Sequence, residues 1–395
     1  MSVIFVGSTV DRETLKTLQD ASVAGNKMEL GFMHGFACNG INIIGVSVEA
    51  HGMWRFNHQP CYLRAKQLKD DEILIKTVSY INIPIIKQLM IQHMLKKELN
   101  RVLSTDEFHN STIVVYNTMS IFARPVLRAA KEQGLNAIAI VADLPIREKK
   151  NIVRRIEDRK QIKSIGRMSA IIPLTKQIAL DFAPDLPYCV VEAGCNPDDY
   201  DDDVLQIDAT SYKNVVFAGT LNSLSGIELI INAMRSVKNH DIILNIYGDG
   251  PLRQFVETAA KSTHNIHYHG KVTNDQMMAI QKKAGLLVCP RKKDDFTTKY
   301  TFPSKILEYI CSGVPVLSNR LPGIPTEYEE YINYATSESE ADWAYAIDTI
   351  LQPEQYVKYT EKARKARECV LVTKDWKWQV KRVLTQMKEQ GIAIT

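Results

Sequence analysis

The stretch KYTFPSKILEYICSGVPVLS, residues 299–318, decides how this chain is built. Its apolar positions predict a short helix that begins at Pro303, where a missing N–H costs nothing, and ends at Gly313, which suits a left-handed stop. The apolar residues after Gly313 predict a buried strand. A helix that runs directly into a buried strand is typical of an α/β protein.

Short apolar strands alternate with amphipathic helices along most of the chain. The predicted strands of the first half are VIFVG, NIIGVSV, TIVVYN, AIAIVADLP and AIIPLT. Those of the second half are VVFAGTL, ILNIYGDG, IHYHGKV, GLLVCP and VPVLS. Near-continuous apolar strands between helices predict parallel sheets that are covered on both faces.

The alternation is interrupted once, at the polar and acidic residues 196–213. We therefore predict two doubly wound domains, an N-terminal one over 1–195 and a C-terminal one over 214–375, with 196–213 as the linker. A further helix is expected within 376–395, and it could lie back across the first domain. Because ligands of open α/β sheets bind beyond the carboxyl ends of the strands, two such domains facing each other would enclose a cleft.

Composition excludes several classes of protein. The chain has 395 residues, of which 45% are hydrophobic and 24% are charged, as expected of a soluble globular protein of two or three domains. The seven cysteines form no C-x-x-C pair, so we expect reduced thiols, a cytoplasmic location and no zinc site. No apolar run approaches the length of a membrane span. The net charge of +4 is too small to indicate nucleic-acid binding.

The charge is unevenly distributed, because residues 147–167 hold nine Lys and Arg against three acids. Apolar residues recur there at helical spacing: Ile152, Val153, Ile156, Ile162 and Ile165. One interpretation is a solvated basic helix with an apolar stripe on the core. The other is a patch that meets an anionic membrane surface, on the inner face of the cell membrane.

The predicted helix at 303–312 has the chemistry of an anion site. The N–H groups of Ser304 and Lys305 point out of its N-terminus, where the helix dipole favours an anion, and Lys305 adds a full positive charge. Glu308 lies one turn further on the same face, and a carboxylate can accept paired hydrogen bonds from a ribose diol. The alternative is an ordinary surface salt bridge between Lys305 and Glu308.

Three other predicted strand ends carry groups that suit an anion. Gly219 and Gly226 flank a loop where backbone can approach a phosphate closely, and Gly250 lies in a second turn after a strand. Arg291 follows the strand GLLVCP, and its guanidinium can hold a phosphate bidentately. Since the carboxyl ends of parallel strands meet at one edge of the sheet, we expect these groups to converge.

The order of FAGTL, YGDGPL, HGKV, CPR and FPSKILEYICSGVPVL resembles the C-terminal half of retaining GT-B glycosyltransferases of family 4. It is most similar to bacterial enzymes of capsule and exopolysaccharide clusters. The resemblance is strong over roughly residues 214–325 and thin over the first 190. It implies a GT-B fold of two Rossmann-like domains facing a cleft. It also implies donor binding by the second domain, with a UDP-sugar as the expected donor, and sugar transfer without a metal.

The resemblance assigns roles to particular residues. Lys305 matches the phosphate-binding lysine of the family, and Glu308 matches the ribose-binding second glutamate of its E-x7-E motif. The stretch HGKV is similar to the loop whose backbone reads the base, which implies base contacts at Lys271 and Val272. Ser304 contributes its N–H at the start of the phosphate-binding helix.

The sequence also departs from the family pattern. The first glutamate of E-x7-E is replaced by Tyr300, and Asp295 is a candidate substitute. In the glycine loop, Thr220 and Ser225 stand where many members carry Arg and Lys. The charge of the diphosphate would then be stabilised by Arg291, by the lysine of the helix and by helix N-termini.

The first half of the chain gives fainter signals. AGNKMELGF, residues 24–32, resembles the acceptor-side loop after the first strand, with Asn26 positioned towards the donor. Asn117 and Asp143 each end a predicted strand, and they are candidates for the acceptor side. For each of the two, a turn-capping role is an equal alternative.

These observations predict a retaining, metal-independent hexosyltransferase. It would move a sugar from a nucleoside diphosphate sugar to an oligosaccharide or lipid-linked glycan in polysaccharide biosynthesis. No cofactor is expected beyond the donor. The missing glutamate keeps a second class open, a non-catalytic GT-B-like subunit that chaperones a partner glycosyltransferase or binds glycan. The sugar, the base and the acceptor stay open.

Overall fold

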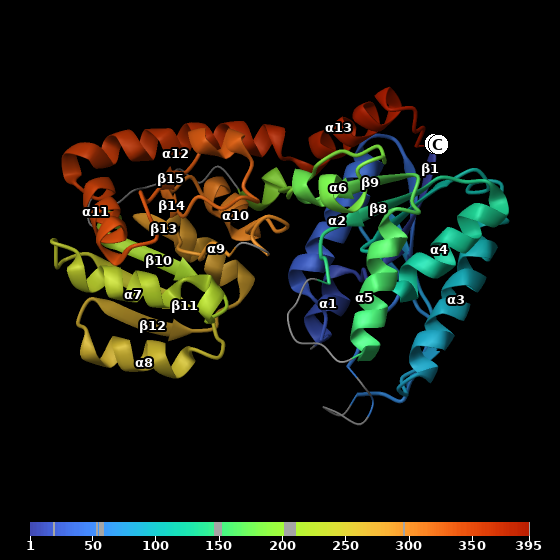
Figure 1. The fold of residues 1–395 in the computed structure, drawn as a ribbon, viewed down its shortest axis with the longest axis horizontal. Helices are drawn as coiled ribbons and strands as arrows, with labels where there is room; N and C mark the ends of the chain where they lie inside the picture. The colour runs from blue at the N-terminus through green and yellow to red at the C-terminus, as the bar shows by residue number, and fades with distance from the viewer. Residues whose placement is uncertain are drawn as a thin grey trace. The chain divides into compact units, whose positions relative to one another are not determined.

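The computed structural model describes residues 1–18, 20–52, 54, 59–145, 152–200, 211–294 and 297–394. Most of the predicted linker, residues 201–210, lies outside the described residues, as do Asp295 and residues 147–151 of the basic segment. The chain forms two compact units (Figure 1). One comprises Met1–Gly194 and Lys374–Thr395, and the other comprises Cys195–Thr373.

The first unit is built on a seven-stranded sheet of order β4-β5-β2-β1-β7-β8-β9. The strands are β1 (Ser2–Gly7), β2 (Asn42–Ser47), β4 (Gln67–Asp70), β5 (Ile73–Thr77), β7 (Thr112–Tyr116), β8 (Ala137–Val141) and β9 (Ala170–Pro173). Only the edge strand β4 is antiparallel to its neighbour. A short antiparallel pair, β3 (Tyr62–Leu63) and β6 (Tyr80–Ile81), lies beside it in sequence. The β-branched runs of the central strands are buried throughout, as a sheet covered on both faces requires.

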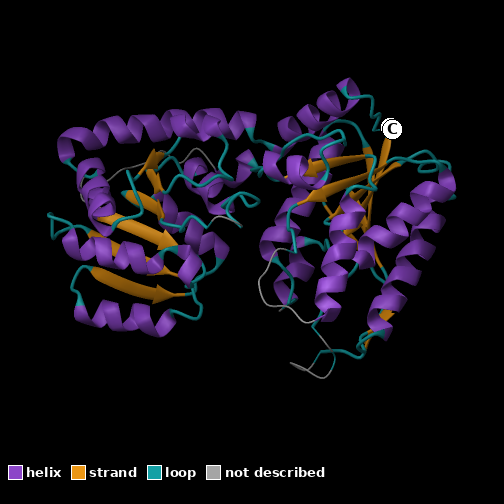
Figure 2. Ribbon diagram, viewed as in Figure 1, coloured by secondary structure: helices purple, strands orange, loops and turns teal. Residues whose placement is uncertain are grey.

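Helices cover both faces of this sheet (Figure 2). They are α1 (Arg12–Thr17), α2 (Val23–Cys38), α3 (Ile86–Leu103), α4 (Ser120–Gln133), α5 (Ile152–Ile165), α6 (Lys176–Phe182) and α13 (Trp376–Glu389). The last helix belongs to the core of this unit, because its Val380, Val383 and Met387 pack with strand residues such as Val3 and Ile140.

The second unit is built on a six-stranded sheet of order β12-β11-β10-β13-β14-β15, in which every pairing is parallel. The strands are β10 (Asn214–Ala218), β11 (Ile243–Tyr247), β12 (Ile266–Gly270), β13 (Leu286–Cys289), β14 (Val316–Ser318) and β15 (Asn333–Tyr334). The helices are α7 (Ile227–Ser236), α8 (Arg253–Ser262), α9 (Asn274–Lys282), α10 (Ser304–Cys311), α11 (Glu340–Ile350) and α12 (Pro353–Thr373). Single turns of 3₁₀ helix occur at Pro197–Tyr200, Ser211–Lys213, Ser223–Ser225 and Thr326–Glu330.

Both sheets contain the doubly wound order 3-2-1-4-5-6 in the sequence of their parallel strands. The predicted α/β class with two Rossmann-like domains is therefore confirmed. In each unit the order reverses between the first and fourth parallel strands, β1 and β7 in one and β10 and β13 in the other. Such a switch point is where the loops diverge and leave room for a ligand. Among the described residues, no helix is both long and apolar enough to cross a bilayer.

Two local predictions are wrong. Residues 24–32 were predicted as a loop but form the first half of α2, which Ser22 begins by accepting a hydrogen bond from Gly25 N. The apolar stripe of α5 was predicted to lie on the core, yet Ile152 and Ile156 are exposed and only Ile165 is fully buried. The reason is that the first two turns of α5 contribute no residue to the described hydrophobic core.

Candidate functional site

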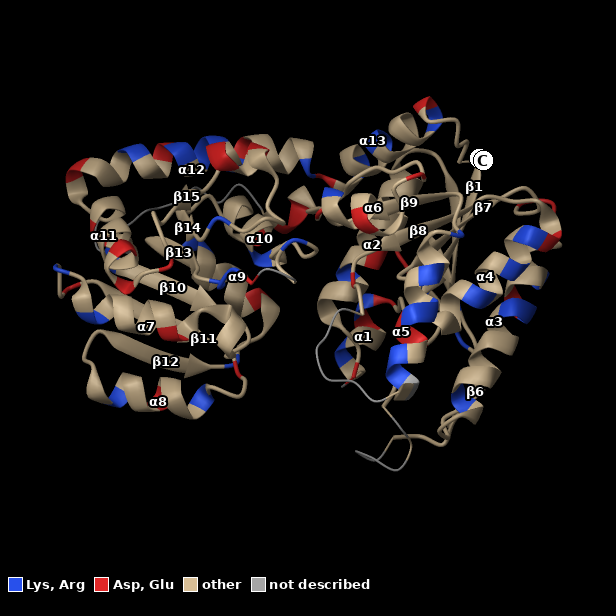
Figure 3. Ribbon diagram, viewed as in Figure 1, with Lys and Arg blue, Asp and Glu red and all other residues tan. Residues whose placement is uncertain are grey.

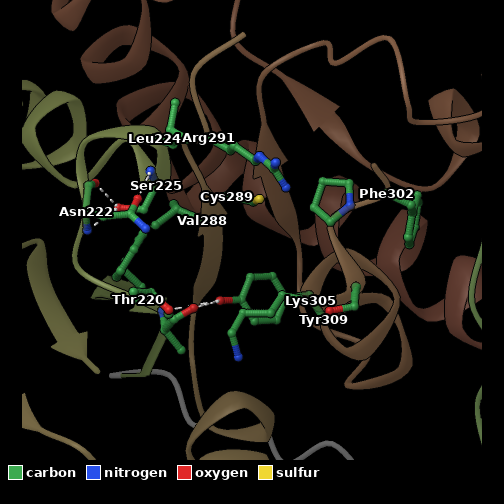
Figure 4. Close-up of a pocket in the computed structure, with 15 residues that line it drawn as sticks. Thr220, Asn222, Leu224, Ser225, Val288, Cys289, Arg291, Phe302, Lys305 and Tyr309 are labelled. Carbon is green, nitrogen blue, oxygen red and sulfur yellow. Dashed lines mark hydrogen bonds between the residues drawn. The ribbon is translucent and has the colours of Figure 1, made fainter. Parts of the chain in front are cut away.

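A cavity of about 350 Å³ opens at the switch point of the second unit (Figure 4). Its lining comes from the loop after β10, the loop after β13 and the start of α10. The predicted residues Gly219, Thr220, Arg291, Ser304 and Lys305 all line it. Their predicted convergence is confirmed, because strand ends that are far apart in sequence meet at this edge of the sheet.

The start of α10 points positive charge at the cavity. Pro303 is the residue that precedes the helix, and Gly313, with φ of 75°, follows its end in the left-handed conformation. The first N–H groups of a helix have no partner within it, so those of Ser304 and Lys305 are oriented to meet an anion. Lys305 also lies beside the glycine loop, since a Cβ on Gly219 would be 3.9 Å from its Cε.

Two glycines allow the loops at this edge to approach each other. Gly226 has φ of 76°, and a Cβ there would stand 1.8 Å from the carbonyl oxygen of Pro290. Gly248 has φ of 136°, and its Cβ would stand 1.8 Å from the carbonyl oxygen of Gly219. Any larger side chain would therefore push apart the loops that form the cavity wall.

Arg291 supplies the second cation of the cavity. One of its terminal nitrogens donates to Thr301 Oγ1 at 3.1 Å, which fixes one side of the guanidinium. The backbone beside it is held as well, because Lys292 N donates to Leu224 O at 3.1 Å. Within the described residues that line the cavity there are two cations, Arg291 and Lys305, and no carboxylate. This set of groups suits an anion rather than a metal ion.

Glu308 does not line the cavity but lies one turn behind its lysine. Its carboxylate is 3.8 Å from Lys305 Nζ, and both side chains are about one-third exposed. The salt-bridge alternative is thus present in the structure, although it leaves Glu308 accessible to a ribose at the same time. Tyr300, which replaces the first glutamate, is buried and packs under Lys299, whose Nζ is 4.7 Å from the ring centre.

Three predicted donor-binding residues lie outside the cavity lining. Gly250 supports the wall, because a Cβ there would be 2.5 Å from Leu221 O, and its own N–H donates to Asp249 Oδ1. Lys271 and Val272 lie in the short segment between β12 and α9, where Lys271 is exposed. Their contact with a base stays a prediction.

Sequence reasoning missed the aromatic part of the lining. Tyr309 is fully buried, and its hydroxyl lies 3.3 Å from Ala218 N and 3.2 Å from Ala218 O, so it ties α10 to the end of β10. Phe302 and Cys289 complete the apolar wall. Burial raises the pKa of both the Tyr309 phenol and the Cys289 thiol, so both groups stay neutral. The only sequence signal for Tyr309 was its place one residue after Glu308.

The candidates of the first unit brace loops at the corresponding edge. Asn26 is buried in α2, where its side chain accepts from Val10 N at 2.8 Å and donates to Val10 O at 3.0 Å. Asn117 has φ of 58°, and its Oδ1 accepts from the N–H groups of Ala142 and Asp143, each at 2.9 Å. Asp143 itself is exposed. These contacts are those of turn-capping residues, and an acceptor role for the three stays a prediction.

A buried carboxyl group closes the same edge. Glu29 of α2 is 1% exposed and accepts from Ser8 N at 3.0 Å and from Ser8 Oγ at 3.0 Å, with Thr9 Oγ1 as a further partner. Burial raises the pKa of Glu29 to about 7, against the opposing effect of these hydrogen bonds. Sequence reasoning gave no sign of this residue, since Glu29 lies in a segment predicted as a loop.

One group of side chains has the types that bind metals, His34, Asp70 and Asp71. Two of the three are already engaged, because His34 Nε2 lies 2.8 Å from Asp70, whose other oxygen accepts from Arg12 N at 3.3 Å. Burial opposes ionisation of Asp70, but these hydrogen bonds outweigh it and lower its pKa. The group is accounted for by a hydrogen-bonded ion pair.

Residues 212–353 match the family of glycosyl transferases group 1. The second unit carries a glycosyltransferase domain. The match spans the cavity and every residue that was proposed to bind the donor. No curated protein matches the sequence.

Solved structures extend the likeness over the whole chain. HepE of Anabaena, solved in complex with UDP, superposes with a TM-score of 0.66 at 14% identity, covering 98% of this chain and 100% of HepE. Sucrose-phosphate synthase of Thermosynechococcus elongatus gives 0.64 at 12% identity, covering 99% and 100%. WaaG, a glycosyltransferase of lipopolysaccharide biosynthesis, gives 0.62 at 16% identity, covering 95% and 98%. At such identities the likeness shows the fold, which is that of the GT-B glycosyltransferases.

Proposed function

We propose that this protein is a hexosyltransferase that takes its sugar from a UDP-sugar with retention of configuration and without a metal. The cavity at the switch point of the glycosyltransferase domain would hold the diphosphate. The observation that carries the proposal is the meeting of Lys305, Arg291 and the start of α10 on one cavity that has no carboxylate among its described lining. HepE, which shares the fold, has been solved with UDP and with UDP-glucose.

The chemical task is to stabilise the diphosphate as its bond to the sugar lengthens. Lys305 Nζ and the guanidinium of Arg291 are fixed cations, and the N–H groups at the start of α10 are oriented dipoles. Groups that are already in place for a developing negative charge need no reorganisation, and one such group contributes about 3 kcal/mol to the transition state. The proposal is therefore electrostatic stabilisation of the leaving group.

Retention is proposed because the described cavity offers no second carboxylate. Retaining glycosidases use a pair of carboxyl groups, one of them as nucleophile. Glu308 is the nearest carboxylate to Lys305 in the ion pairs of α10, and it lies behind the lysine rather than in the cavity lining. We infer that the acceptor attacks the same face from which the diphosphate leaves, and that the departing phosphate oxygen takes the acceptor proton.

The acceptor is proposed to be an oligosaccharide or a lipid-linked glycan of a polysaccharide pathway in the cytoplasm. A non-catalytic GT-B-like subunit is the second candidate, and the buried Tyr300 in place of a glutamate favours it. The two differ in one measurable property. An enzyme releases UDP from a UDP-sugar, whereas a subunit that only binds glycan does not.

The test combines nucleotide binding with turnover on the purified full chain. Thermal unfolding with UDP, GDP and dTDP reads the base, since a ligand at 100 times its Kd stabilises by about 2.7 kcal/mol. UDP release from UDP-glucose, UDP-galactose and UDP-N-acetylglucosamine is then followed with and without a chelator. Stabilisation by UDP together with chelator-resistant release supports the proposal. Binding without release from any of the three would favour the non-catalytic subunit, and loss of release with the chelator would overturn metal independence.

A further inference from the structure

Three helices of the first unit begin at the same edge of its sheet. The helices α3, α4 and α5 each lead into or out of parallel strands of one sheet, in the order α3, β7, α4, β8, α5, β9. Because each connection returns antiparallel to the strands, all three helices start at the carboxyl edge. The contacts of α3 with α4 and of α4 with α5 place them side by side.

Large apolar side chains are exposed at each of these three starts. On α3, Ile85 is 79% and Leu89 is 64% exposed, and on α5, Ile152 is 75% exposed. The full set, which we call the apolar rim, is Ile85, Ile86, Leu89, Met119, Ile152 and Ile156. Single exposed apolar residues are common, but a gathering on neighbouring elements marks an interaction surface.

One member of the apolar rim is held in a strained backbone conformation. Ile85 has φ of 69° and ψ of −55°, and Ile86 N donates to Pro84 O at 2.8 Å across it. This is the γ-turn of the rarer hand, which is unfavourable for a β-branched residue. Glycine would adopt it without strain. An exposed isoleucine at this position adds nothing to the core, so its side chain indicates a use outside the fold.

Positive charge accompanies the apolar rim. The exposed cations of α5 are Arg154, Arg155, Arg159, Lys160 and Lys163, which alternate with its exposed isoleucines (Figure 3). Lys and Arg each contribute about 1 kcal/mol near an anionic lipid surface. Apolar side chains among cations are the chemistry of an element that lies in the headgroup region, whereas a protein partner of this charge would have to bury unpaired lysines and arginines.

We propose that the apolar rim inserts into the interfacial layer of an anionic bilayer while the cations of α5 contact lipid headgroups. The rim then brings the carboxyl edge of the first unit to the membrane, so the acceptor is a lipid-linked glycan. The membrane contact is independent of catalysis, but the identity of the acceptor rests on the proposed function.

The test is flotation of the full chain with vesicles made of equal parts phosphatidylglycerol and phosphatidylcholine. The variant Ile85→Gly removes an exposed side chain and relieves the γ-turn. We expect vesicle affinity to fall on the order of tenfold, as for one apolar side chain withdrawn from lipid, while the midpoint of thermal unfolding stays unchanged or rises. A purely structural role of Ile85 predicts the opposite pattern, a lower midpoint and unchanged affinity.

Two further variants separate the apolar and electrostatic parts. Ile86→Ser with Leu89→Ser should weaken binding at low and at high salt, whereas Arg155→Gln with Arg159→Gln and Lys160→Gln should remove mainly the salt-sensitive part. The control is Val357→Ser, an equally exposed apolar residue on α12 of the other unit, which should bind like the wild type.

Failure of this inference is distinguishable from failure of the proposed function. Stabilisation by UDP is measured in parallel on every variant, and it should be the same as in the wild type because no rim residue lines the cavity. If the wild type does not float with anionic vesicles at low salt, or if Ile85→Gly floats as well as the wild type, the membrane assignment is overturned whatever the enzymatic result.

Discussion

The two switch points of this molecule share one topology and differ in what fills them. In the second unit, the edge where β10 and β13 diverge keeps a cavity that Lys305 and Arg291 line. In the first unit, the edge at β1 and β7 carries Asn26, Glu29 and Asn117, whose side chains are spent on nearby backbone groups. The same strand order thus gives one open cationic edge and one edge closed by neutral or acidic side chains.

The difference teaches that the fold supplies the location and the loops supply the chemistry. A doubly wound sheet offers a crevice in both units, but only the second has side chains that an anion can use. The first unit instead has ordered, short loops suited to present a surface. Changes that exchange these properties test the comparison.

The largest effect is expected for Lys305→Ala. Loss of this cation should lower UDP-sugar turnover by about 10²-fold, or about 3 kcal/mol, because a preorganised charge no longer stabilises the departing diphosphate. Steady-state UDP release measures it. The control is Lys271→Ala, which removes an exposed lysine that does not line the cavity and should leave turnover near that of the wild type. Near-normal turnover of a well-folded Lys305→Ala protein would exclude this lysine from the mechanism.

The next effect concerns the closed edge of the first unit and pH. The pKa of Glu29 is raised from 4.5 to about 7, so the folded state keeps the proton more tightly than the unfolded state. The contribution of Glu29 to stability is therefore fully present below pH 4.5 and is lost as the pH rises to about 7, by about 2 to 3 kcal/mol.

Glu29→Gln should remove this pH dependence, because glutamine resembles the protonated side chain. Native-state hydrogen exchange at the amides of β1, compared between pH 5 and pH 8, reads the stability of this unit alone. The control is Glu13→Gln, an exposed residue of α1, which should keep the wild-type profile. An unchanged pH profile in Glu29→Gln would assign the dependence to another group.

A smaller effect is expected for Glu308→Gln. If the carboxylate accepts hydrogen bonds from a ribose diol, the affinity for UDP should fall by about tenfold, which corresponds to one hydrogen bond to a charged group. Calorimetry with UDP measures it, and Glu257→Gln on α8, another surface ion-pair partner, is the matched control. Unchanged affinity would reduce Glu308 to a surface partner of Lys305.

The smallest effect separates two substitutions of Asn117. Asn117→Gly keeps the left-handed conformation and loses the hydrogen bonds to Ala142 and Asp143, which should lower the free energy of unfolding by about 1 kcal/mol. Asn117→Ala adds the strain of φ at 58° and should cost about 1 kcal/mol more. Chemical denaturation of the two variants provides the comparison. Equal losses would show that the backbone conformation relaxes in the alanine variant.

The open edge was predictable because its residues obey local rules. Lys305 begins a helix between Pro303 and Gly313, and Arg291 follows a buried strand directly, so the alternation of elements alone places both at the carboxyl edge. The hydroxyl of Tyr309 was not predictable in the same way. Its role depends on Ala218, which is 91 residues away in the chain, and no local pattern encodes that contact.

The helix α2 shows why the first unit was harder to predict. Gly31 and Gly35 gave its segment the composition of a loop, but both are in the helix to let α13 approach. A Cβ on Gly31 would be 2.1 Å from the side chain of Trp376, and one on Gly35 would be 2.5 Å from Trp376 O. A glycine required by packing against a distant helix is indistinguishable, in sequence alone, from one required by a turn.

The position of α13 has a consequence for biosynthesis. The first unit needs the last helix, because Val380, Val383 and Met387 fill its core and Lys374 forms a buried pair with Glu192 at 2.6 Å. Domains usually fold in the order in which the ribosome releases them. Here the glycosyltransferase domain, Cys195–Thr373, emerges whole before the segment that completes the unit synthesised ahead of it. The nascent N-terminal half therefore waits, with an apolar groove uncovered, until translation ends.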